Sequence, residues 1–101
     1  MLYNEAVSMV RGKRNATKRK IGNNTTAEIM SDGSVGIKLH NTYVVTIRSD
    51  NSAVLHSGGW RTSTTKDRIN KYSHAGLYQK DFVWYLRDGT EYYDGYVLLQ
   101  V

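Results

Sequence analysis

The chain has 101 residues, carries a formal net charge of +5, and contains neither cysteine nor proline. This length fits one domain with a modest core, and a chain without cysteine has no disulfide or thiolate metal site. His40, His56 and His74 lack metal-ligand spacing, and no apolar run approaches the roughly 18 residues of a membrane span. Because the N-terminus also lacks a signal-peptide pattern, we expect one cytoplasmic domain over residues 1–101 with no metal and no cofactor.

The positive charge is concentrated in the first twenty residues. The basic residues there are Arg11, Lys13, Arg14, Lys18, Arg19 and Lys20, against Glu5 alone, while residues 21–101 hold eight basic and eight acidic side chains. The sequence therefore predicts a basic N-terminal helix or arm over residues 1–20 and a neutral β-rich core over residues 21–101. Such an arm can attract phosphates by electrostatic steering, and the alternative is a solvated, solubilising face.

In chain order, the spacing of Tyr3, Val7 and Val10 predicts a short helix over residues 3–11 that ends at Gly12. Residues 13–20 are interpreted as a polar connector. From Ile21 onward the apolar residues recur with a period of two, and turns rich in Gly, Asp, Asn and Ser separate the segments. The predicted strands are 25–30, 35–40, 43–48, 53–57, 77–80, 82–87, 91–93 and 96–100.

A second helix interrupts these strands. Thr64 is its expected N-cap, Asp67 complements the dipole of its first turn, and it covers about 64–72 before Gly76. Together the elements predict an α+β fold, with one antiparallel β-meander sheet, one inserted helix and a short N-terminal helix.

No catalytic constellation is visible. The chain has no nucleophile elbow, no phosphate-cradling glycine loop, and no Ser, His and acid in a known spacing. The carboxylates of Asp32, Asp50, Asp88 and Asp94 fall in predicted turns, where they are expected to bond nearby backbone groups. We therefore expect a binding protein rather than an enzyme.

The segment from Leu55 to Asn70 has the richest chemistry. Two glycines let the backbone adopt positive φ or approach a ligand closely, and a helix start follows, where N–H groups, the Thr64 hydroxyl, and Arg61 or Lys66 suit a phosphate. Trp60 can stack on a base. The alternative is a glycine bulge with Trp60 in the core and the threonines only capping the helix.

Alternation along residues 82–87 separates Phe82, Trp84 and Leu86 from Val83, Tyr85 and Arg87. The aromatic residues there and at 92–96 are expected chiefly to pack across strands, with base stacking as the alternative. Arg87 ends its strand, so its guanidinium can reach a cleft and bind phosphate. A surface arginine paired with Asp88 or Asp81 is the alternative for this residue.

Three blocks carry a family resemblance: IGNNT…GIKLHNTYVVT, LHSGGWRTSTTKDRIN and LYQKDFVWYLRDGTEYYDG. Over about Ile21 to Gly95 the chain resembles the Thoeris anti-defence protein 1 family of phages, most specifically in SGGWRT-x-TTK-x-RIN. The resemblance implies a non-catalytic sponge that captures cyclic ADP-ribose isomers made by TIR-domain immune enzymes in the infected bacterial host. It also implies that some members capture cyclic oligonucleotides of CBASS defence at a second site, and that protomers assemble as dimers and hexamers.

The resemblance also assigns residue roles. It implies that Trp60, Asn70 and Arg87 form the ligand pocket, with a further basic residue from the N-terminal region. The candidates for that residue are Arg11, Arg14, Lys18 and Arg19. This N-terminal region is shorter than the family's, so the resemblance does not fix the oligomer size.

Three classes of function remain open at this point. The first is the sponge, and the second is a small basic nucleic-acid-binding β module of phage origin. The third is a small phage protein that plugs a host enzyme. Salt dependence separates the first two, because binding to a polyanion weakens steeply with salt. In each case we expect a homo-oligomer, because a chain of this length has a limited core for its aromatic residues.

Overall fold

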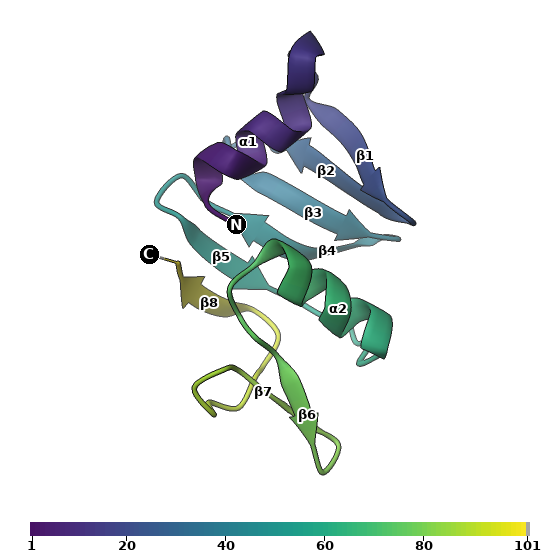
Figure 1. The fold of residues 1–101 in the computed structure, drawn as a ribbon, viewed down its shortest axis with the longest axis vertical. Coiled ribbons are helices and arrows are strands. Elements are labelled where there is room, and N and C mark those ends of the chain that lie inside the picture. Colours follow the sequence, from purple (N-terminus) through teal and green to yellow (C-terminus); the bar gives the residue numbers. More distant parts are fainter. Residues whose placement is uncertain (101) are drawn as a thin grey trace.

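The computed structural model describes residues 1–100, in which two helices lie on the same face of an antiparallel sheet (Figure 1). Helix α1 covers Tyr3–Arg11 and is followed by a 3-10 turn, η1, over Gly12–Arg14. Helix α2 covers Ser63–Tyr72. No helix within residues 1–100 is both long and apolar enough to cross a membrane.

The main sheet has six strands in the order β1-β2-β3-β4-β5-β8, and every neighbouring pair is antiparallel. The strands are β1 Lys18–Gly22, β2 Thr25–Ile29, β3 Val35–Leu39, β4 Thr42–Ile47, β5 Ser52–Leu55 and β8 Tyr96–Leu99. A separate hairpin pairs β6, Tyr78–Lys80, with β7, Val83–Tyr85. The predicted α+β fold with a β-meander and two helices is confirmed, although the strands form two sheets rather than one.

The core lies between the helices and the sheet. Ala6 and Val10 of α1 and Ile69 of α2 are fully buried, as are Ile37 and Val45 beneath them. Helix α1 packs over β1, β2 and β3, and α2 packs over β3 and β4. Alternation places one apolar face of each central strand against the helices, which is the pattern that predicted these strands.

Two predictions about the chain path were wrong. Residues 18–20 belong to strand β1, although they were expected in a polar connector, so the sheet begins inside the predicted basic arm. All three side chains are exposed on an edge strand, so no hydrophobic alternation marks them as a strand. Residues 91–93 do not form a strand, and only Glu91 makes an isolated bridge, to Tyr85.

The two outer strands of the main sheet differ in chemistry. At one edge, β1 exposes Lys18, Arg19 and Lys20. At the other edge, β8 carries no charge, and its Val97 and Leu99 side chains are 43% and 75% exposed. Cationic side chains protect a sheet edge from pairing with another chain, whereas exposed apolar side chains do not.

Candidate ligand-binding groove

A groove of about 480 Å³ opens between the β3–β4 turn and the N-terminal end of α2. Its lining residues are Leu39, His40, Asn41, Thr42, Val44, Ser57, Trp60, Thr62, Thr64 and Thr65. The volume lies within the roughly 300–1,000 Å³ range of small-molecule sites. The lining combines an apolar floor with hydroxyl, amide and imidazole groups at the rim.

The β3–β4 side of the groove is shaped by a bulge. Ile37 pairs with Val45 and Lys38 pairs with Tyr43, so Val44 is the extra residue of β4. A bulge increases local twist and redirects side chains, and here Val44 lies buried in the groove floor. His40 begins the turn with φ of 54°, which brings His40 and Asn41 to the rim.

The other side of the groove is the start of α2. Thr62 is the N-cap, and its hydroxyl oxygen accepts a hydrogen bond of 3.2 Å from the backbone N–H of Thr65. Helix α2 therefore begins at Ser63 rather than at about residue 64, and its cap is Thr62, two positions before the predicted cap Thr64. The first N–H groups of a helix lack intrahelical partners and carry the positive end of the dipole, so this end suits an anion.

Trp60 lies on the rim, and its side chain is 68% exposed. The alternative that placed Trp60 in the core is therefore wrong. A large aromatic side chain held at the mouth of a groove provides a stacking surface for a planar ring.

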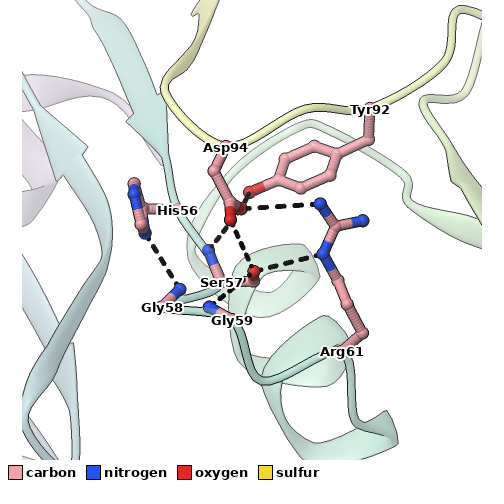
Figure 2. Close-up of polar contacts among 7 residues, drawn as sticks. All are labelled: His56, Ser57, Gly58, Gly59, Arg61, Tyr92 and Asp94. Carbon is pink, nitrogen blue, oxygen red and sulfur yellow. Dashed lines mark hydrogen bonds and ion pairs between the residues drawn. The ribbon is translucent and has the colours of Figure 1, made fainter.

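A polar network centred on Asp94 fixes the loop that presents Trp60 (Figure 2). The Asp94 carboxylate accepts hydrogen bonds from the Ser57 backbone N–H at 2.8 Å, the Ser57 hydroxyl at 3.0 Å and the Tyr92 hydroxyl at 2.8 Å. The Ser57 hydroxyl oxygen accepts in turn from Gly59 N–H at 3.2 Å. Asp94 thus holds Ser57, just after strand β5, directly in place, and holds Gly59 through the Ser57 hydroxyl.

The same network sets the charge state of its members. Burial opposes ionisation of Asp94, but hydrogen bonds from the Ser57 N–H, the Tyr92 hydroxyl and the Ser57 hydroxyl outweigh it and lower the pKa of this carboxyl group. Burial, followed by the hydrogen bond to Asp94, raises the pKa of Tyr92. The folded protein therefore holds Asp94 charged and Tyr92 neutral over a wide pH range.

Arg61, a predicted ligand contact, belongs to this network and not to the groove lining. Its Nε donates to the Ser57 hydroxyl at 3.2 Å, and Nη2 lies 3.9 Å from Asp94 (Figure 2). Its guanidinium carbon lies 5.1 Å from the Trp84 ring centre and 4.9 Å from that of Tyr92, within cation–π range. These contacts give Arg61 a structural role.

Among the remaining predicted residues, the structure places only Thr64 with Trp60 at the groove. The amide of Asn70 is occupied, since its Nδ2 donates to Leu77 O at 2.9 Å and its Oδ1 accepts from Leu77 N at 2.7 Å. Arg87 is exposed beside Gly76 and does not line the groove, and neither does Lys66.

The N-terminal candidates lie elsewhere. Arg11, Arg14 and Arg19 line a separate cleft, and Lys18 is exposed on β1. The structure therefore does not bring the basic arm to the groove within one copy of the chain.

Sequence reasoning missed several groove residues. His40 was predicted as the last residue of the strand 35–40, and Asn41 and Thr42 as the connection to the next strand. Their position opposite α2 depends on the long-range pairing of the sheet. Asp94 was interpreted as a turn residue, whereas it bonds Ser57, 37 positions away. The one local signal was Thr62, a good N-cap residue two positions before the predicted start of the helix.

Gly58 provides a test of how the loop is packed against the groove. Its φ is 64°, and a Cβ there would lie 2.4 Å from Oγ1 of Thr42. Gly59 is a matched control, since its φ is 83° but a Cβ there meets nothing within 4 Å. We expect Gly58→Ala to lower the free energy of unfolding by roughly 1–3 kcal/mol more than Gly59→Ala, because both suffer the backbone strain and only the first is overpacked. Urea unfolding of the two variants measures the difference, and equal stability would contradict this packing.

The fold and the groove together define a small α+β protein with a ligand-sized groove on its surface. The chain belongs to the Kyanoviridae Gp96 protein family, whose model matches residues 3–99, and it is therefore a phage protein. No curated protein matches it, and no solved structure matches it. Within residues 1–100, no group of three or more His, Cys, Asp or Glu residues is placed to hold a metal ion.

Proposed function

We propose that this phage protein binds a cyclic nucleotide signal in the groove without turnover and so sequesters it from host immunity. The first candidates are cyclic ADP-ribose isomers of TIR-based Thoeris signalling, followed by cyclic oligonucleotides of CBASS. The proposal rests chiefly on Trp60, a mostly exposed aromatic side chain on the rim of a ligand-sized groove that opens at a helix N-terminus. The resemblance to the Thoeris anti-defence protein 1 family supports the same ligand class.

The groove chemistry corresponds to the parts of such a ligand. Trp60 would stack on adenine, and the start of α2 with the Thr62 and Thr64 hydroxyls would bind a phosphate. His40 and Asn41 on the opposite rim would bond ribose hydroxyls. Among residues 1–100, the groove lining includes no carboxylate, so His40 is its one acid–base side chain and has no acidic partner in the lining to orient it.

Capture and turnover give different products. We expect the protein, incubated with a cyclic ADP-ribose isomer, separated from free ligand and then heated, to release that isomer unchanged, as measured by mass spectrometry. Linear ADP-ribose that rises with protein concentration would contradict capture. The control is protein unfolded by heat before incubation, which should retain no ligand.

Parallel incubations with cyclic dinucleotides and trinucleotides identify the ligand class. Retention of one of these, with no retention of cyclic ADP-ribose, would keep the sequestration proposal and change its target. Retention of none of them by the folded protein would overturn the proposal.

A further inference from the structure

We infer that the chain has a second binding site, a basic cleft at the C-terminal end of α1 that binds the phosphate backbone of nucleic acid. The cleft has a volume of about 480 Å³. Its lining residues are Val10, Arg11, Gly12, Lys13, Arg14, Ala16 and Arg19. Four of these seven residues are lysines or arginines, whereas the groove beside α2 has none in its lining.

Local backbone geometry brings these cations together. Gly12 has φ of 53° and ends α1, the 3-10 turn follows, and Asn15 has φ of 50°. The chain thereby turns back toward α1, and the Ala16 N–H donates to Arg11 O at 3.1 Å. Arg19 returns along β1, and its Nη1 donates to Met9 O at 3.2 Å. Residues that a straight helix would spread apart therefore surround one cleft.

The charge of the cleft is not neutralised by the protein. Within residues 1–100, the ion pairs are Arg61 with Asp94 and Arg68 with Asp67, so no cation of the cleft has an acidic partner. Residues 6–27 contain no Asp or Glu. Four cations without a counterion repel one another, and a bound polyanion would relieve that repulsion and release its own counterions.

The extent of the positive charge favours a polymer over a single small anion. The cations continue beyond the cleft, since Lys18 and Lys20 are exposed along the edge strand β1. By alternation these two side chains lie on the face of the strand opposite to Arg19, so this edge of the sheet carries positive charge on both of its faces. The hydrogen bond to Met9 explains the position of Arg19 alone and leaves Arg11, Lys13 and Arg14 without a structural partner.

The cleft offers no aromatic surface on which an unpaired base could stack. None of its lining residues is aromatic, and the exposed aromatic side chains belong to residues 60–93. Figure 1 shows the 3-10 turn after α1 and the β6–β7 hairpin at opposite ends of the long axis. Binding at the cleft should therefore depend on phosphates and not on sequence, with strong salt dependence.

Fluorescence anisotropy with a labelled DNA duplex of about two helical turns tests the inference between about 50 and about 200 mM salt. We expect two unrelated sequences to bind equally. The triple variant Arg11→Gln, Lys13→Gln, Arg14→Gln should reduce the slope of log affinity against log salt by about 2–3, because each phosphate contact contributes about 0.9. At the lowest salt its affinity should fall at least about tenfold.

A matched control removes the same charge outside the cleft. The variant Lys71→Gln, Lys80→Gln, Arg87→Gln changes three exposed residues and should keep the wild-type slope. Equal weakening by both triple variants, or unchanged binding in the cleft variant, would overturn the inference. So would loss of duplex binding in Trp60→Ala, which would assign the nucleic acid to the groove. Thermal melts verify that all variants are folded.

This inference is independent of the proposed function. The cleft variant should still retain the cyclic nucleotide, since none of its substituted residues lines the groove. Duplex binding without nucleotide retention, or the reverse, would identify which of the two proposals fails.

Discussion

Asp94→Ala is expected to lower the free energy of unfolding by about 2–4 kcal/mol, since a hydrogen bond to a charged group contributes about 1.5–3 kcal/mol and linked bonds are not additive. The substitution removes the acceptor of three hydrogen bonds, from the Ser57 N–H, the Ser57 hydroxyl and the Tyr92 hydroxyl. Ser57 and Tyr92 are buried, so water cannot readily replace the lost acceptor. Arg61 also loses its ion-pair partner.

Asp88→Ala is the matched control for this substitution. Asp88 also accepts a backbone hydrogen bond, from Thr90 at 2.9 Å, but it lies in an exposed turn. We expect a loss below about 1 kcal/mol there, because water can hydrate the freed N–H. Urea unfolding curves measure both variants, and an equal loss of stability would show that Asp94 is only a turn residue.

The pH dependence gives an independent measure of the same network. Because the folded-state pKa of Asp94 is lowered, its contribution is present above the ordinary carboxyl pKa of about 4 and is lost as the pH falls through the folded-state value. The stability difference between wild type and Asp94→Ala should therefore shrink as the pH falls below about 4. A difference that stays constant to low pH would contradict a charged Asp94 in the folded state.

Trp60→Ala is expected to weaken binding of the captured cyclic nucleotide about 5- to 150-fold, corresponding to the roughly 1–3 kcal/mol of a stacked base. The melting temperature without ligand should change little, because the indole is 68% exposed and its removal leaves no cavity in the core. Calorimetric titration with the ligand retained in the mass-spectrometry experiment, together with a thermal melt, measures both quantities.

Phe82→Ala is the control for the loss of an exposed aromatic side chain. Phe82 is 94% exposed and does not line the groove, so its removal should leave both affinity and stability unchanged. Unchanged affinity in a folded Trp60→Ala variant would remove Trp60 from the site, and with it the main support for the proposed function.

The central part of the fold could be predicted because local chemistry and long-range packing agree there. Strands β2 and β3 bury residues at alternate positions, among them Ala27, Ile37 and Leu39. Asp32 and Asp50 bond the backbone within their own turns, as expected of turn residues. Strand β1 could not be predicted from alternation because its first three residues are all exposed. Its pairing with β2 is a property of the sheet rather than of its own sequence.

In the candidate site, too, residues recognised by their sequence neighbours could be predicted, and residues placed by long-range pairing could not. Trp60 and Thr64 could be found because a glycine loop, an aromatic residue and a helix start follow one another in the chain. His40 and Asn41 could not, because they reach the groove only through the pairing of β3 and β4. Asn70 was matched by motif, but the motif does not reveal that Leu77 occupies both polar ends of its amide.

The contrast between the two outer strands limits how copies of this chain can join. Contact between two β1 strands would set cations against cations, and β1 against β8 would leave the cations of β1 without an acid, since residues 95–100 contain none. Pairing of β8 with β8 opposes no charges and is two-fold symmetric. It also uses both uncharged edges and leaves only cationic edges facing outward. Edge-to-edge pairing of copies through the main sheet would therefore stop at a dimer. The lysines and arginine of β1 would disfavour the addition of further copies, and so the formation of open-ended fibres.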